Sequence, residues 1–152
     1  MPKQLNPAHA AAWRTFLEAH AAVTDALSRE LEKERDLPLP WYDVLVQLQE
    51  APRNELRMAE LARSVLLSKS GLTRLVDRME RAGLVERRVC EEDGRGLLAA
   101  MTPAGRDVLR KAAPVHVRGI DEHFTSHLTE AEARALRGAF NKVLRAHERI
   151  PR

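Results

Sequence analysis

The stretch from Met58 to Thr102 constrains the fold more than any other part of this chain. Its apolar spacing predicts two short helices, of which the second ends at Gly83, a residue that tolerates the left-handed conformation beyond a helix. Two strand-like runs follow, joined by a charged turn that contains two glycines. The first helix is expected over 58–64, the second from 68–70 onward, and the strands over 85–90 and 97–101.

The second of these helices has two contrasting faces. Apolar residues recur on one side at helical spacing, which predicts that this side is buried. The other side is polar and mainly basic, which predicts an exposed cationic surface. The apolar residues are Leu72, Leu75, Val76 and Met79, and the polar ones are Thr73, Arg74, Arg78 and Arg81. A helix pair followed by a hairpin is the layout of a winged helix-turn-helix.

Charge is distributed unevenly along the 152 residues. Residues 1–56 hold 6 basic and 9 acidic side chains, a balance of −3, whereas residues 57–111 hold 12 basic and 8 acidic, a balance of +4. The net charge of +3 alone says little about partners. The concentration of positive charge in the helix–hairpin segment is what favours a phosphate-binding surface.

Long helices are predicted at both ends of the chain. Asn6-Pro7 starts a helix that should run to about Arg35, and a shorter one should follow from Pro40 to about Glu50. Thr102-Pro103 opens another long helix, in which Pro114 predicts a kink or break. A last helix is expected over about 130–149, behind the capping box Thr129–Glu132. Helices of this length predict a dimer seam, because one small domain cannot bury their apolar sides.

Two segments of this sequence resemble the MarR family of bacterial transcription regulators. Residues 72–87, LTRLVDRMERAGLVER, look like that family's recognition helix running into its wing. Asp93-Gly94-Arg95, followed by Met101-Thr102-Pro103-Ala104-Gly105, looks like its wing signature and the start of its next helix, with Met101 in place of the usual Leu. The resemblance covers nearly the whole chain. It implies a mainly α fold with a two-stranded β-wing, a homodimer formed by the terminal helices, and a palindromic operator.

We therefore expect residues 37–102 to form the DNA-binding region, and residues 1–36 and 103–152 to form the helical dimerisation region. Hydroxyls and helix N-terminal amides can meet phosphate, and arginine can reach a base edge or the minor groove. The predicted DNA-binding residues are Ser68, Lys69, Ser70, Thr73, Arg74, Arg78, Arg87 and Arg95. Asp93 and Gly94 are expected to shape the wing. Because residues alternate along a strand, only one of Arg87 and Arg88 is expected to contact phosphate.

Other features carry weaker predictions. The resemblance implies a small aromatic or phenolic effector, with His20, Trp41 and Val44 near its pocket. The single cysteine, Cys90, excludes an intrachain disulfide and is expected to be an apolar filler rather than a redox sensor. His123 and His127 have the spacing of a helical metal pair but lack a third ligand, so neither a metal nor another cofactor is expected.

The sequence thus predicts a regulator that binds double-stranded DNA as a homodimer, a ligand-responsive repressor in the cytoplasm with no membrane partner. A winged-helix module that binds proteins and not DNA is the alternative. An enzyme on the same helices is a third, weaker option, because the sequence contains no phosphate-binding glycine loop, nucleophile elbow or metal triad.

Overall fold

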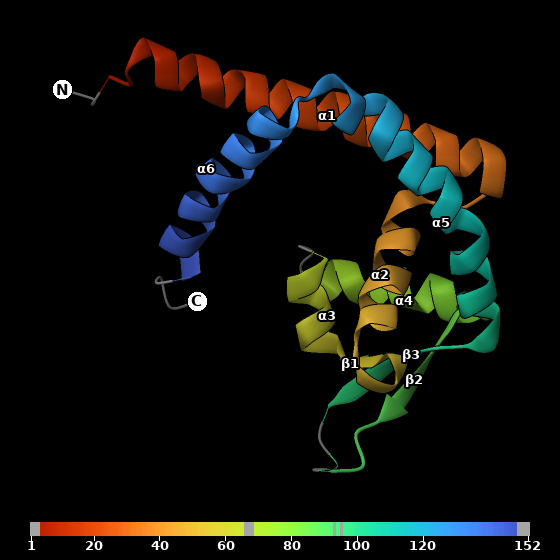
Figure 1. Cartoon of the computed structure of the whole chain (residues 1–152). Helices are drawn as coiled ribbons and strands as arrows, with labels where there is room; N and C mark the ends of the chain where they lie inside the picture. The colour runs from red at the N-terminus through yellow and green to blue at the C-terminus, as the bar shows by residue number, and fades with distance from the viewer. Residues whose placement is uncertain (1–3, 66–68, 93, 95, 149–152) are drawn as a thin grey trace. The chain divides into compact units, whose positions relative to one another are not determined.

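The computed structural model describes residues 4–65, 69–92, 94 and 96–148. Its helices are α1 (Pro7–Arg35), α2 (Leu39–Glu50), α3 (Met58–Ser64), α4 (Lys69–Arg81), α5 (Pro103–His123) and α6 (Glu130–Glu148), as Figure 1 shows. The strands are β1 (Glu55–Arg57), β2 (Val85–Val89) and β3 (Leu97–Met101), with short 3-10 turns η1 (Pro52–Asn54) and η2 (Thr125–His127). The chain is therefore mainly helical with a small sheet, as predicted.

Two compact units divide the chain, and each has its own packing. The central unit spans 27–116 and holds α2, α3, α4 and the sheet. The terminal unit combines 1–26 with 117–152, so it contains most of α1 together with α6.

Side chains at the helix starts satisfy the backbone groups that helices leave open. Asn6 Oδ1 accepts a hydrogen bond from the Ala8 amide at 2.9 Å. At the start of α6, the Thr129 amide donates to Glu132 Oε2 at 2.8 Å and the Glu132 amide donates back to Thr129 Oγ1 at 3.3 Å. The caps predicted at Asn6 and at Thr129, the second of which is a reciprocal capping box, are confirmed.

The sheet has three strands, whereas the sequence predicted only the two strands of the wing. β3 lies in the middle and pairs antiparallel with β2 on one side and with β1 on the other. β1 was missed because it has three residues, too few for an alternating pattern, and because its partner lies some 40 residues away in the sequence. Leu56 pairs with Ala99 across this added edge.

The core of the central unit is aliphatic. Helix α4 contributes its predicted apolar side, of which Val76 and Met79 are fully buried. α2 and α3 supply Val44, Leu48 and Leu61, all with no exposed surface. Burying such a side chain stabilises a fold by about 1.5–3 kcal/mol, so this packing fixes α4 against the rest of the unit.

α5 runs without interruption from Pro103 to His123, so of the kink or break expected at Pro114 the break does not occur. Pro114 is exposed, and water can hydrogen-bond the carbonyl group that loses its helical partner there.

No helix within the described ranges combines the length and apolar character needed to cross a membrane.

A tight corner joins the end of α4 to the start of α5. The Thr102 hydroxyl donates to the Gly83 carbonyl at 2.6 Å and accepts from the Gly105 amide at 3.0 Å. The Thr102 amide donates to the Leu84 carbonyl at 3.1 Å. The backbone of Gly105 therefore lies directly against Leu84, and a Cβ on Gly105 would stand only 2.1 Å from the Leu84 oxygen.

We predict that Gly105→Ala destabilises the protein by about 2–3 kcal/mol, because the new methyl group meets backbone rather than a movable side chain. Urea unfolding at one fixed protein concentration measures this change. Gly138→Ala on α6 is the matched control, since no described atom outside the neighbouring backbone of its own helix lies within 4 Å of the position that its Cβ would occupy. The control should change stability by no more than about 1 kcal/mol, in the stabilising direction. Equal stability of both variants would contradict the close contact at Gly105.

Candidate nucleic-acid interface

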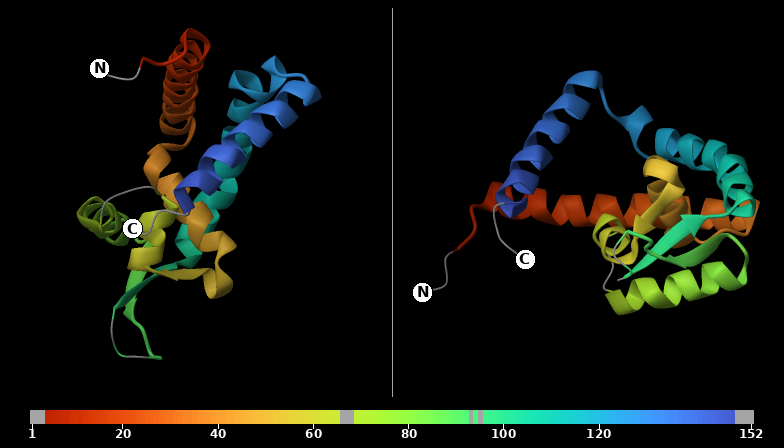
Figure 2. Two further views of the ribbon diagram at one scale, coloured as in Figure 1. Left: turned by 90° about the vertical axis from the view of Figure 1, so that its left-hand side faces the viewer. Right: turned by 90° about the horizontal axis from the view of Figure 1, so that it is seen from below.

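Helix α4 presents its polar side to solvent next to the wing, which we define as the β2–β3 hairpin, residues 85–101. Seen from below in Figure 2, α4 and the hairpin lie side by side. The apolar side of α4 is buried as predicted, and this forces the polar side outward. The exposed residues predicted to bind DNA are Ser70, Thr73, Arg74 and Arg78.

Two arginines of this side, Arg74 and Arg78, are available to a ligand. Among the described residues, neither Arg74 nor Arg78 forms an ion pair with a carboxylate, and both are exposed. They are four positions apart and so lie on one side of the helix. Lys69 is the first residue of α4, whereas Ser68, Asp93 and Arg95 lie outside the described residues. The DNA contacts predicted for Ser68, Lys69 and Arg95, and the role in shaping the wing predicted for Asp93, remain predictions.

The end of α4 fixes where the wing begins. Gly83 has a φ of 77°, the left-handed conformation that its sequence position predicted. The Leu84 amide donates to the Met79 carbonyl at 3.0 Å, and the Gly83 amide donates to the Glu80 carbonyl at 2.9 Å. This pair of bonds is the Schellman motif, which ends the helix and turns the chain directly into β2.

Arg87, a predicted phosphate contact, points back toward α4. Its Nη2 lies 2.6 Å from Asp77 Oδ1, and its Nε lies 3.2 Å from Glu80 Oε2. The hydrogen bond that the Arg87 guanidinium donates to Glu80 raises the pKa of Arg87 above its ordinary value. The guanidinium is therefore already held by two carboxylates of α4.

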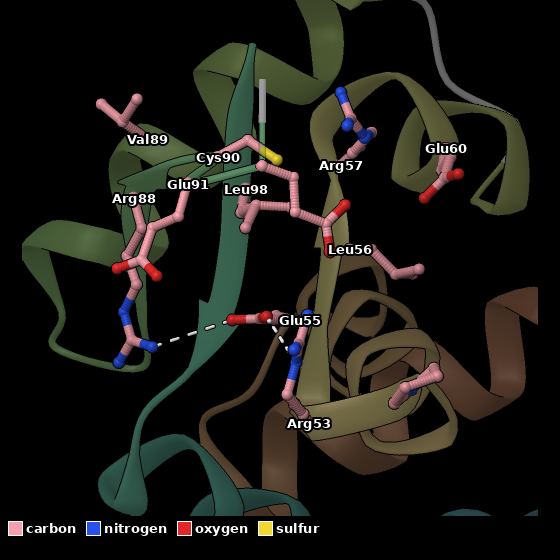
Figure 3. Close-up of a pocket in the computed structure, with 12 residues that line it drawn as sticks. Arg53, Glu55, Leu56, Arg57, Glu60, Arg88, Val89, Cys90, Glu91 and Leu98 are labelled. Carbon is pink, nitrogen blue, oxygen red and sulfur yellow. Dashed lines mark ion pairs between the residues drawn. The ribbon is translucent and has the colours of Figure 1, made fainter. Parts of the chain in front are cut away.

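Arg88 lies on the opposite side of the sheet, as the alternation along β2 requires. Figure 3 shows Arg88 reaching toward Glu55 of β1, at 3.8 Å, while Arg53 approaches the same carboxylate at 3.1 Å. Arg88 also pairs with Glu86 on its own strand. Of the two neighbouring arginines, Arg88 is the more exposed, at 57% against 27%, whereas Arg87 was the one named among the predicted DNA-binding residues. The sequence analysis did not identify Glu55 as a partner of these arginines, because it did not predict the strand β1 that carries Glu55.

A hollow of about 650 Å³ lies beside these charges, lined by η1, β1, Glu60 of α3 and the part of the wing nearer its turn. Cys90 lines it but is only 4% exposed, which fits the predicted role as an apolar filler. Arginines and glutamates both line this hollow, so its surface does not have the predominance of one charge that would favour an anionic or a cationic ligand.

The three residues predicted near an effector pocket have different surroundings. Val44 is fully buried in the core, and His20 is exposed within the terminal unit. Trp41 is half-buried and lines a hollow of about 360 Å³ together with Leu75 and Arg78 of α4. Only Trp41 of these three therefore contributes to a described surface hollow next to α4.

The surroundings of His116 determine its protonation state. His116 packs its ring against Tyr42, with centroids 4.3 Å apart, and burial lowers the pKa of His116 despite the opposing effect of Asp43. His116 therefore favours the neutral form at pH 7.

His123 ends α5, whereas His127 lies in η2 and its Nε2 is 3.0 Å from the Glu122 carbonyl oxygen. The expected placement of His123 and His127 on one helical face is therefore wrong.

A cationic helix packed beside a β-hairpin defines a winged helix-turn-helix protein. Residues 35–96 match the sequence model of the MarR family. The repressor Rv2887 of Mycobacterium tuberculosis is 31% identical over 107 residues, which cover 70% of this chain and 75% of that protein. The chain belongs to the MarR family of transcription regulators.

Solved structures agree with this assignment. AbsC, a MarR-family regulator from Streptomyces coelicolor, is 35% identical, with a TM-score of 0.89 and coverage of 96% of this chain and 98% of AbsC. Sco3205 from the same organism, solved in complex with DNA, is 34% identical with a TM-score of 0.89 and coverage of 96% and 91%.

Proposed function

We propose that this protein is a sequence-specific DNA-binding transcription regulator, acting in the cytoplasm as a repressor. The observation that carries the proposal is the exposed basic side of α4, whose Arg74 and Arg78 have no carboxylate partner among the described residues. The DNA complex of Sco3205, a relative with the same fold, supports it. The alternative, a winged-helix module that binds only proteins, has no need of such a surface.

In this proposal α4 enters the major groove, where the N-terminal half of a recognition helix meets base edges. Arg74 reads a base, guanine by preference, and Ser70, Thr73 and Arg78 contact the backbone or neighbouring bases. Arg95 contacts the flanking minor groove, as the resemblance implies. A two-fold symmetric dimer would place two such helices on half-sites about 10–10.5 base pairs apart.

The homodimer is proposed to form through the terminal unit. Phe16 of α1 packs against Phe140 of α6 with ring centroids 5.1 Å apart, yet much apolar surface beside this pair is uncovered. Trp13 is 58% exposed and Leu144 is 59% exposed. A contiguous apolar surface of this kind marks an interface, and a second copy would bury the same residues on both chains.

We further propose that a small aromatic effector binds at Trp41 and weakens DNA binding. The hollow that Trp41 lines also contacts Leu75 and Arg78, so a ligand there touches the recognition helix itself. A ligand can release DNA only if it binds more tightly to the conformation that does not fit the operator.

Fluorescence anisotropy tests the DNA proposal, with a duplex from the protein's own upstream region beside a scrambled duplex. We expect tight binding to the native duplex alone, and log affinity that falls steeply with log salt concentration. Arg74→Ala should weaken binding by about 1–3 kcal/mol and relax the preference at one base position. Arg110→Ala on α5, which removes the same charge outside α4, is the control. If both duplexes bind equally weakly, the next experiment is selection of binding sites from random-sequence DNA. If no DNA sequence is enriched in that selection, the protein-binding alternative is favoured.

The dimer proposal predicts that Leu144→Glu shifts the protein toward the monomer, because the new carboxylate would be buried without a partner at the seam. Sedimentation velocity over a range of concentrations measures this shift. Lys142→Glu, on another side of α6, reverses a charge without touching the apolar side and should leave the dimer intact. An unchanged dimer in Leu144→Glu would place the interface elsewhere.

The effector proposal predicts that Trp41→Ala abolishes release of DNA by simple phenols and aromatic carboxylates, while Lys142→Ala, on the side of α6 away from the apolar surface, does not. The measurement is loss of anisotropy of the protein–DNA complex during titration with these compounds. The chain has two tryptophans, so a Trp13→Phe variant reports quenching at Trp41 alone. Release that persists in Trp41→Ala would exclude this hollow as the effector site.

A further inference from the structure

The contact between Arg87 and α4 joins the two elements that the proposed function brings to DNA. Asp77 and Glu80 both belong to α4, whereas Arg87 belongs to the first strand of the wing. Glu80 is bound twice, because its Oε2 accepts from the Arg87 backbone amide at 3.0 Å as well as from Nε at 3.2 Å. The carboxylate therefore fixes the strand itself and not only the end of a flexible side chain.

Partial burial distinguishes this contact from a fully exposed surface ion pair. The side chain of Arg87 is 27% exposed, and those of Asp77 and Glu80 are 33% and 39% exposed. Hydrogen bonds between charged groups are short and directional, and the planar guanidinium holds both carboxylates in one orientation. Its counterpart on the other side of the sheet, Arg88, is 57% exposed and, within the described part of the chain, makes no such link to α4.

The contact also explains two acidic residues on a helix that would approach a polyanion. Free carboxylates at Asp77 and Glu80 would repel phosphate, and a negative charge near the C-terminal end of a helix is unfavourable by itself. The positive charge of Arg87 offsets one of these charges. These charges are explained if the three residues hold α4 and the wing in a fixed relative orientation and do not themselves attract DNA.

We infer that Arg87 is a positioning residue: with Asp77 and Glu80 it fixes the angle between the recognition helix and the wing, and it does not contact phosphate. The inference rests on the proposed DNA-binding function. Its consequence is that base reading by α4 in the major groove and contact by the wing in the minor groove occur together. Without the link, α4 still fits its groove while the wing no longer holds its place on the flank.

Asp77→Asn separates this inference from direct phosphate contact by Arg87, because the two accounts predict opposite signs. If Arg87 positions the wing, losing the Asp77 carboxylate weakens operator binding, by about tenfold for one charged hydrogen bond. If Arg87 contacts phosphate, removing a carboxylate beside it frees the guanidinium and tightens binding. Tighter binding by Asp77→Asn would overturn the inference.

The experiment uses full-length protein and the duplex that the wild type binds, so failure of the wild type to bind any DNA refutes the proposed function and not this inference. Arg87→Gln and Glu80→Gln should weaken binding as Asp77→Asn does. The slope of log affinity against log salt should change by the same amount in Arg87→Gln and Asp77→Asn, because both variants release the wing. A slope lowered by about 0.9 in Arg87→Gln alone, as loss of a direct phosphate contact predicts, would overturn the inference.

Footprinting at saturating protein gives the readout that a loss of stability alone would not change. In Arg87→Gln and Asp77→Asn, guanine N7 atoms in the major groove should stay protected, while hydroxyl-radical protection of the flanking minor groove is lost. Uniform loss of both protections would overturn the inference. Glu86→Gln is the matched control, because it removes a carboxylate from β2 that pairs with Arg88 and not with α4. If Arg87→Gln is unfolded by thermal melting, the milder Asp77→Asn decides the result.

Discussion

The hydroxyl group of Thr102 sits at the junction on which the arrangement of the central unit depends. It connects the carbonyl of Gly83, just beyond α4, to the amide of Gly105 in the first turn of α5. Both ends of the wing leave from this junction, since β2 starts at Val85 and β3 ends at Met101. One side chain thus caps α5 and closes the base of the hairpin. The absence of a Cβ at Gly105 permits this, because the Leu84 carbonyl occupies that space.

Local signals in the sequence were sufficient to predict most of the helices. Asn6, Thr129 and Glu132 have the cap chemistry that the structure contains, and the apolar spacing of Leu72, Leu75, Val76 and Met79 identified the buried side of α4. Such signals act over three or four residues, so they need no knowledge of the tertiary fold. The polar side of α4 followed from the same spacing, which is why the exposed part of the candidate interface could be predicted.

Features that depend on distant partners could not be predicted in this way. β1 exists because β3 offers it hydrogen bonds, and three residues carry no periodicity of their own. Alternation along β2 required Arg87 and Arg88 to face opposite sides, but the choice between those sides depended on the carboxylates of Asp77 and Glu80. Pro114 shows the reverse case: its local signal favours a break, and exposure of that side of α5 allows the helix to continue. The contacts of Ser68 and Arg95 remain predictions.

The closed base of the wing fixes the paired strands and the end of α4, and leaves the length of the turn at the other end of the hairpin free to vary. At the far end of the strands, the Cys90 amide donates to the Gly96 carbonyl at 3.3 Å, so the ladder is held together up to the turn. Residues inserted between these two positions would lengthen the hairpin without shifting the register of β2 against β3 or the end of α4. Relatives with hairpins of different reach can therefore evolve on one unchanged helical frame, and the turn is the natural place to exchange target preference between them.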